Sequence, residues 1–278
     1  MTGIGISYGA VSVINAMPAC IGATIGISLR TVAKFTPGGD ERIVKIKNDP
    51  SEDIMMAWKC VSESYSHMNL TEPFGWSLEI DSEIPISRGL KSSSSACNAI
   101  ISAVMDENGH SIDTIEMIRL GVKCAKLANV TVTGSFDDAC GCHLGGFVMT
   151  DNTNNEIIMS KDVDDLDVIV YVPDKKIRKA GLPVEELRKK APEMLKIIEI
   201  AKTDPFKAMI ENGRLMSPLS GVENSVAELA LENGALGAGM SGSGPAVAII
   251  LKKGDTRSFL ERTGLKDVII TTTRRSIL

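Results

Sequence analysis

Residues Ser87–Ala99 read SRGLKSSSSACNA, and four consecutive serines fall between a strand-like segment and a segment with helical periodicity. A serine tract on its own is typical of a flexible linker. Directly behind this one, however, apolar residues recur at helical spacing, at Ala96, Ala99, Ile100, Ala103 and Val104. This stripe excludes a linker and predicts that a helix begins within the serine run.

The start of that helix has the features of an anion site. The first turn of a helix presents unpaired backbone N–H groups and the positive end of the helix dipole. Gly89 allows the backbone to approach a ligand closely, and Lys91 adds a cation. These features favour phosphate, and a serine hydroxyl at such a position can also bind Mg²⁺. The alternative is an ordinary serine-capped helix whose remaining serines face solvent.

Two well-known phosphate motifs are absent from the sequence. The loop lacks the G-x-x-x-x-G-K-[ST] pattern, and no G-x-G-x-x-G follows a first strand. Neither a P-loop of that kind nor a Rossmann dinucleotide site is therefore predicted.

A second glycine-rich segment, Gly237–Ile250, reads GAGMSGSGPAVAII and precedes a strand-like run. Its first eight residues hold four glycines and two serines, which is more glycine than a simple turn requires. We therefore expect part of this segment to contact a ligand. Near the N-terminus, four small or polar residues on an apolar background could line a pocket or belong to a glycine-rich strand pair: Ser7, Tyr8, Ser12 and Asn15.

Adjacent acids lie in TGSFDDAC, Thr133–Cys140, which we interpret as a glycine-containing loop between two strands. Either Asp137 or Asp138 could accept a proton from a hydroxyl group, although an acid pair in a surface turn would look the same. The CGCH run that follows, Cys140–His143, does not have a standard zinc spacing. The six cysteines are scattered, and we expect them to be reduced and buried.

The order of elements predicts an α+β fold with two lobes. Helices are expected from Ser51 and from Asp113, where Glu116 completes a capping box. A long helical region, Pro183–Glu232, is interrupted near its prolines. We place the lobe boundary at the turn-rich stretch Asp151–Asn155, which gives lobes of residues 1–152 and 153–278.

Composition excludes several classes of function. The net charge of −5 and the aromatic content of 4% give no basis for binding nucleic acid. No apolar run reaches the roughly 18 residues of a membrane span, and no signal peptide is recognisable, so we expect a soluble cytoplasmic protein. The oligomeric state does not follow from the sequence.

In this order, the three segments resemble the motifs of the GHMP small-molecule kinases. PISRGLKSSSSA is similar to the P-x-x-x-G-L-x-S-S-x-A phosphate loop of that superfamily, GSFDDA stands where many members carry the catalytic aspartate, and GAGMSGSGP looks like their glycine-rich third motif. Within the superfamily, the opening SYGAVSVINAMPACIGATIGI, the loop GLKSSSSACNA and the length are most similar to the archaeal-type shikimate kinases. The resemblance extends from the first residues to about Leu251.

The resemblance implies a GHMP kinase fold, with a mixed α/β N-terminal lobe, a ferredoxin-like C-terminal lobe and ATP bound between them. It implies Asp137 as the catalytic base and Ser93 as the hydroxyl that faces Mg²⁺. It also implies that ATP contacts two loops, at Arg88, Gly89, Leu90, Lys91, Ser92, Ser93, Ser94, Gly239, Ser241 and Gly242.

The implied activity is the ATP-dependent phosphorylation of shikimate to shikimate 3-phosphate. The shikimate carboxylate requires a cationic partner, for which Arg88, Arg178 and Arg214 are the candidates. Three alternatives remain open: a kinase for another alcohol such as homoserine or mevalonate, a nucleotide-binding relative without catalysis, and a decarboxylase that phosphorylates its substrate transiently.

Overall fold

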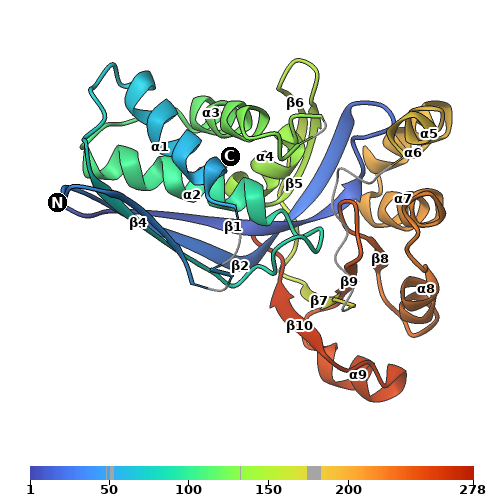
Figure 1. Ribbon diagram of the computed structural model, residues 1–278. Coiled ribbons are helices and arrows are strands. Elements are labelled where there is room, and N and C mark those ends of the chain that lie inside the picture. The colour runs from blue at the N-terminus through green and yellow to red at the C-terminus, as the bar shows by residue number, and fades with distance from the viewer. Residues whose placement is uncertain (48, 51–52, 132, 174–182) are drawn as a thin grey trace.

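The computed structural model describes residues 1–47, 49–50, 53–131, 133–173 and 183–278. Two β-sheets, one of six strands and one of four, organise two lobes that lie side by side. Helices α1–α4 cover one face of the larger sheet, and helices α5–α8 gather at its far end beside the smaller sheet (Figure 1). The two-lobed α+β architecture expected from the sequence is confirmed.

The N-terminal sheet is built around the long strand β2 (Ile21–Pro37). One edge of β2 pairs antiparallel with β1 (Gly3–Ile14). Its other edge pairs antiparallel with β4 (Trp76–Ser82) near one end and with β5 (Phe147–Asp151) near the other. The outer strands are β3 (Arg42–Ile46), parallel to β4, and β6 (Glu156–Lys161), antiparallel to β5.

Four helices pack on this sheet: α1 (Met55–His67), α2 (Ser92–Glu107), α3 (Thr114–Leu127) and α4 (Phe136–Leu144). The helix predicted from the serine run is α2, which begins at Ser92 and packs its buried face against β1 and β2. The Asp113 cap is also confirmed, because its carboxylate accepts hydrogen bonds from the backbone N–H groups of Ile115 and Glu116. The start expected at Ser51 lies outside the described residues.

The C-terminal sheet has the strand order β10-β7-β9-β8 with antiparallel neighbours. Its strands are β7 (Asp167–Tyr171), β8 (Gly237–Met240), β9 (Val247–Leu251) and β10 (Val268–Thr272). Helices α5 (Val184–Arg188), α6 (Ala191–Ala201), α7 (Pro205–Ser220) and α8 (Ser225–Glu232) join β7 to β8, and α9 (Thr256–Thr263) joins β9 to β10. Numbered within the lobe, this order is 4-1-3-2, the ferredoxin-like arrangement that was expected.

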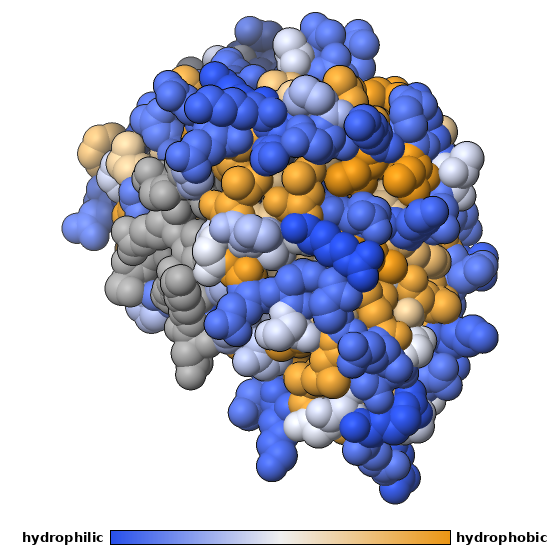
Figure 2. Space-filling view, turned by 90° about the vertical axis from the view of Figure 1, so that its right-hand side faces the viewer, coloured by the Kyte–Doolittle hydropathy of each residue, from blue (hydrophilic) through white to orange (hydrophobic). Residues whose placement is uncertain are grey.

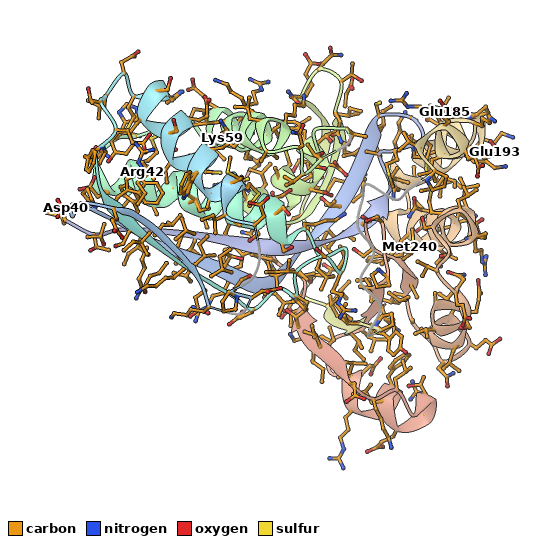
Figure 3. All side chains as sticks on the ribbon, viewed as in Figure 1. Asp40, Arg42, Lys59, Glu185, Glu193 and Met240 are labelled. Carbon is orange, nitrogen blue, oxygen red and sulfur yellow. The ribbon has the colours of Figure 1, made fainter. Side chains whose placement is uncertain are left out.

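Charged and apolar side chains separate as in other compact folds. The face formed by the C-terminal helices carries hydrophilic side chains with smaller hydrophobic patches between them (Figure 2). Glu185 and Glu193 point outward from α5 and α6, whereas Met240 of β8 lies in the interior (Figure 3). Met240 is completely buried, in a core cluster that residues of both lobes share.

The structure differs from the sequence interpretation around the acids. Residues Phe136–Leu144, interpreted as loop and strand, form helix α4, so Asp137 and Asp138 stand in the first turn of a helix. The turn at Asp151–Asn155 joins β5 to β6 within the first sheet. Because the hydrogen bonding of that sheet continues to Lys161, we propose a lobe boundary after Lys161 rather than at residue 152.

Candidate active site

Helix α2 begins without a side-chain cap. Its N-cap residue is Lys91, which adopts the left-handed conformation with φ of 66°. The backbone N–H groups of Ser92, Ser93 and Ser94 stand in the first turn, where no carbonyl of the helix itself can accept them. The helix start therefore offers hydrogen-bond donors and a positive partial charge to a ligand, as the serine run predicts.

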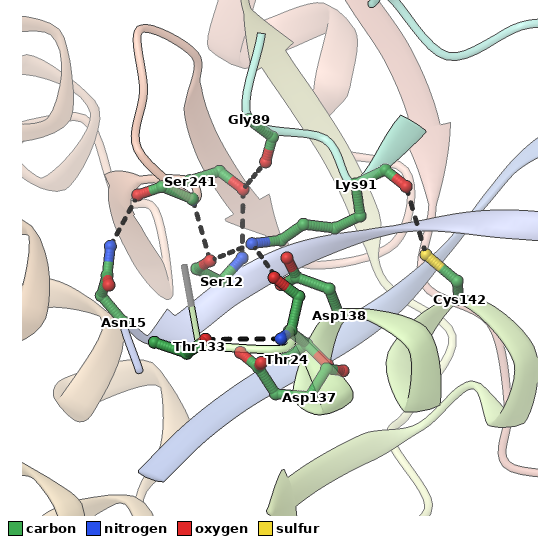
Figure 4. Close-up of polar contacts among 12 residues, drawn as sticks. Ser12, Asn15, Thr24, Gly89, Lys91, Thr133, Asp137, Asp138, Cys142 and Ser241 are labelled. Atoms are coloured by element: carbon green, nitrogen blue, oxygen red, sulfur yellow. Dashed lines mark hydrogen bonds and ion pairs between the residues drawn. The ribbon is translucent and has the colours of Figure 1, made fainter. Parts of the chain in front are cut away.

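The loop that precedes α2, Ser87–Lys91, lies directly against the glycine-rich loop of the other lobe. A Cβ atom at Gly89 would lie 2.1 Å from the carbonyl oxygen of Ser241, so only glycine permits this approach. The Ser241 hydroxyl donates to the Gly89 carbonyl at 2.8 Å and accepts from the backbone N–H of Ser12 at 3.1 Å. Two loops and strand β1 are thus held at one point, where the lobes meet (Figure 4).

Lys91 turns its side chain inward from the helix start. Its Nζ lies 2.8 Å from Oδ1 of Asp138 and donates to the Ser12 hydroxyl at 2.7 Å. The same hydroxyl accepts from the backbone N–H of Gly242 at 2.8 Å. Lys91 is therefore not an exposed loop cation but the buried centre of a network that includes both lobes (Figure 4).

Asp137, the neighbouring acid, is held by different partners. Its Oδ1 accepts from the Asn152 amide at 2.7 Å, and its backbone N–H donates to Oδ1 of Asn152 at 3.1 Å. Its backbone carbonyl accepts from the Thr24 hydroxyl at 3.0 Å. A Cβ atom at Gly22 would lie 2.2 Å from Asp137 Oδ2, so this carboxylate fits against β2 only because residue 22 is glycine.

The electrostatics of the two acids and the lysine are coupled. Burial, and then the adjacent Asp138 carboxylate, raises the pKa of Asp137 to about 6, while Lys91 and the Asn152 amide act in the opposite direction. Burial opposes the charge of Lys91, but attraction by Asp138 and Asp137 outweighs it, and the pKa of Lys91 is raised. Lys91 is therefore an ammonium ion at neutral pH.

Two pockets flank the start of α2. The first, here called the acid pocket, has a volume of about 380 Å³ and is lined by Lys91, both acids and neutral polar residues that include Ser12, Asn15, Thr133 and Ser135. The second, here called the apolar pocket, has a volume of about 690 Å³ and is lined by Ser92, Ser93 and mostly apolar residues that include Met56, Ala57, Ile80 and Ala96. A ligand that bridges both pockets would pass the N–H groups of the helix start.

The structure brings most of the candidate residues together, but not all of them. Ser12 and Asn15 line the acid pocket, and Gly242 lines it from the second lobe. Leu90 is completely buried in the core, and Gly239 lies in β8 against α7, where a Cβ atom would meet the Met209 carbonyl at 2.6 Å. Arg88 hydrogen-bonds to the Pro173 carbonyl.

Arg214, another arginine candidate for a substrate carboxylate, lines neither pocket. Arg214 is occupied by Glu228 at 2.8 Å and by Glu211 at 3.2 Å on the surface of α7 and α8. Arg178 lies outside the described residues. Among the residues that line the acid pocket, Lys91 is the cation.

Sequence reasoning missed Asn152 and Gly22. Asn152 follows strand β5 in the turn to β6 and reaches α4 only because the sheet and the helix pack together. Gly22 lies in a sequence with many glycines, and nothing in its neighbours distinguishes it. The signals that identify both residues are therefore tertiary.

The cysteines of the CGCH run lie in the protein interior. Cys140 and Cys142 are completely buried in α4, and burial raises the pKa of both thiols well above its usual range. Within the described ranges, no three or more His, Cys, Asp or Glu side chains form a group that could hold a metal ion. No helix found in those same ranges is long and apolar enough to cross a membrane.

Comparison with known proteins identifies the family of the chain. Residues 54–146 match the family model for the GHMP kinases N terminal domain, and residues 182–263 match that for the GHMP kinases C terminal domain. The shikimate kinase of Methanosarcina mazei is 35% identical, over 98% of this chain and 94% of that protein. The shikimate kinase of Pyrococcus furiosus is also 35% identical, over 99% of this chain and 100% of that protein.

Solved structures of more distant proteins share the fold. The mevalonate kinase of Methanococcus jannaschii superposes with a TM-score of 0.81 at 20% identity, covering 99% of this chain and 98% of that one. A homoserine kinase from Cytophaga hutchinsonii superposes with a TM-score of 0.75 at 15% identity, covering 99% of this chain and 95% of that one. At these identities the likeness is one of fold alone.

Proposed function

The chain belongs to the GHMP kinase family, and we propose that it transfers the γ-phosphoryl group of ATP to a hydroxyl of shikimate, giving shikimate 3-phosphate. The nearly full-length similarity to shikimate kinases favours this acceptor over homoserine and mevalonate, whose kinases share the fold at much lower identity. The observation that carries the proposal is the buried Lys91–Asp138 pair at the start of α2, with a pocket on either side.

The two pockets supply separate places for the two substrates. The apolar pocket suits a nucleoside, because its walls are largely aliphatic and it adjoins Ser92 and Ser93. The triphosphate would then follow the first turn of α2, where the backbone N–H groups are available to phosphate oxygens. Its γ-phosphoryl group would reach Lys91, and the acceptor would occupy the acid pocket, whose serine, threonine and asparagine side chains suit a polyol.

Mg²⁺ fits this arrangement as an ion held mainly by phosphate oxygens and water. Mg²⁺ commonly takes only one or two ligands from the protein in kinase sites. Ser93, in the first turn of α2, would contribute its hydroxyl oxygen as a ligand to the ion. When bound, the ion would neutralise part of the charge on the transferring phosphoryl group.

We assign the proton acceptor to Asp138 rather than to Asp137, the residue expected from the sequence. Asp138 pairs with Lys91 at the phosphate end of the pocket. One carboxylate oxygen of Asp137 accepts a hydrogen bond from the Asn152 amide, and the other faces the backbone of β2 at Gly22. These contacts support a direct role for Asp138 and a supporting role for Asp137.

The Lys91–Asp138 ion pair suggests how the transition state of phosphoryl transfer is stabilised. As the acceptor oxygen bonds to the γ-phosphorus, the bond to the ADP oxygen breaks and the hydroxyl proton passes to Asp138. A protonated Asp138 no longer neutralises Lys91, so the ammonium charge becomes available to the phosphoryl oxygens at that moment. Most of the rate enhancement would still come from positioning and charge neutralisation.

A panel of acceptors with ATP and Mg²⁺ tests the substrate. Shikimate should be phosphorylated with a kcat/KM far above that for homoserine or mevalonate. Equal or better turnover of either competitor would overturn the shikimate assignment, and release of carbon dioxide from mevalonate diphosphate would indicate the decarboxylase alternative.

The cytoplasmic location and the proposed lobe boundary stay predictions.

Two single variants test the acid assignment. Asp138→Asn should lower kcat by about 10²–10⁴-fold, the usual size of a general-base effect, with ATP binding retained. Asp137→Asn keeps the oxygen that accepts from Asn152 and should reduce kcat much less. The reverse order of effects would restore Asp137 as the base, and an unchanged kcat in both variants would exclude the pair from catalysis.

A further inference from the structure

The last residues of the chain leave the second sheet and cross onto the N-terminal lobe. Beyond β10, Thr273 forms an isolated β-bridge with Ile27 of β2, and the Arg274 backbone N–H donates to the Gly26 carbonyl at 2.9 Å. The carbonyl of Arg274 accepts from Gly146, and the Ile277 N–H donates to the Leu144 carbonyl at 2.9 Å. The C-terminus consequently lies beside α4 of the N-terminal lobe (Figure 1).

The side chain of Arg274 contacts the end of helix α4. Its guanidinium donates to the carbonyl oxygens of Cys142 at 3.1 Å and of His143 at 2.6 Å. Carbonyl groups in the last turn of a helix have no partner in the helix itself and carry its negative partial charge, so a cation there satisfies both requirements. The guanidinium also lies 4.3 Å from the ring centroid of Tyr8 on β1.

Helix α4 connects this contact to the acid pocket. It has 9 residues, with Asp137 and Asp138 in its first turn and the carbonyls that accept from Arg274 in its last. Cys142 in that last turn also directs its thiol to the Lys91 carbonyl, at 3.7 Å. A shift of the C-terminal end of so short a helix would therefore move both acids and the residue that begins α2.

We propose that Arg274 is a positioning residue for phosphoryl transfer: the C-terminal segment Thr273–Leu278 holds helix α4 in register with the phosphate loop, although it touches neither pocket. This inference depends on the proposed function in one respect: the acids that catalyse phosphoryl transfer are those carried by α4. Because this segment continues directly from β10, the second lobe helps to position the two acids, in addition to supplying the glycine-rich loop.

Arg274→Met and Arg274→Lys test this proposal, with Arg275→Met as the matched control. Arg275 is the adjacent residue, 74% exposed, and its guanidinium lies 3.8 Å from Asp162 at the surface. ATP binding by calorimetry gives the number of intact sites in each preparation, and kcat is expressed per intact site. Tyr8→Leu separates the ring contact from the two carbonyl hydrogen bonds.

Arg274→Met should lower kcat per intact site by at least tenfold while KM for ATP changes less than twofold. Arg274→Lys, which keeps the charge but loses the planar fork, should recover part of that loss, and Arg275→Met and Tyr8→Leu should stay near the original kcat. If Arg274→Met lowers only thermal stability or the number of intact sites, the segment is merely structural and the proposal fails. Failure of the acceptor panel with normal ATP binding would instead overturn the proposed function.

Discussion

The ammonium nitrogen of Lys91 lies 2.8 Å from Oδ1 of Asp138, and the two side chains are only 4% and 10% exposed. The lysine is the N-cap residue of helix α2, and the aspartate stands in the first turn of α4. Two buried charges this close must be paired, because either charge alone would lose its hydration without compensation. The pair therefore links the part of the site that would hold phosphate to the part that would hold the acceptor.

Lys91→Met should destabilise the protein strongly and abolish most activity. It leaves Asp138 buried without a counter-charge, which costs on the order of 3–5 kcal/mol in the free energy of unfolding. Lys123→Met is the matched control, because the Lys123–Glu63 pair is as short, at 2.6 Å, but its lysine is 59% exposed. That exposed pair should contribute about 0–1 kcal/mol in urea unfolding. Similar losses in both variants would contradict the distinction.

Asp137→Asn should remove a pH dependence of stability. The pKa of Asp137 is about 6 in the folded protein and about 3.9 in an unfolded chain, so the folded state binds more protons between these values. Asp137 by itself should therefore lower the free energy of unfolding as pH rises from about 4 to 6, whereas the partly buried His143, whose pKa is lowered to about 4 by burial, acts in the opposite direction over the same range. The slope of the variant should differ from that of the original protein by the contribution of Asp137, a gain of up to about 3 kcal/mol at pH 7.

Urea unfolding from pH 4 to 7 measures that slope in both proteins. Asp162→Asn serves as the control, because Asp162 is exposed and its pKa is lowered, first by a backbone hydrogen bond from Ser276. A lowered pKa acts in the opposite direction and only at more acidic pH, so this control should keep the slope between pH 4 and 6. An identical slope in Asp137→Asn would show that Asp137 is not the group responsible.

Gly22→Ala should displace the acid pair, although Gly22 itself lines neither pocket. The added methyl group would lie 2.2 Å from Asp137 Oδ2 and 2.4 Å from its Cγ. A displacement of about 1 Å in a catalytic group can cost about 10²-fold in rate, and a loss of that size is expected in kcat. Gly9→Ala on β1 is the control, because its new Cβ meets only side-chain atoms at 3.3 Å or more. Retained activity in Gly22→Ala would mean that the acids do not depend on this contact.

Ala96→Leu should narrow the apolar pocket. Ala96 lies one turn into α2 and lines this pocket together with Met56 and Ile80. The larger side chain should raise KM for ATP at least tenfold and leave KM for the acceptor within twofold, because the acid pocket is separate. Ala96→Ser should behave nearly as the original protein. A change confined to KM for the acceptor would indicate that the acceptor binds in the apolar pocket and the nucleotide in the acid pocket.

Local sequence signals predicted the elements whose ends carry standard caps or clear periodicity. The helix behind the serine run and the Asp113 cap are both present, because each depends on residues within a few positions of one another. Helix α4 was missed for the converse reason. Eight of its 9 residues are buried, so it has no polar face to reveal a helical period, and the hydroxyl of its N-cap residue Ser135 does not cap the helix start but pairs with Thr131.

The sequence by itself determined the composition of the candidate site: a helix start proposed to bind phosphate, a glycine-rich loop, an acid pair and, through their order, the two-lobed GHMP kinase fold. Only the tertiary structure decided which partner each charged group has. Lys91 turns inward to Asp138, Asp137 is held by Asn152 in the space left by Gly22, and Arg274 reaches α4 from the far end of the chain. These contacts join residues far apart in sequence, and a buried charge takes whichever partner the packing of sheet and helices places within reach.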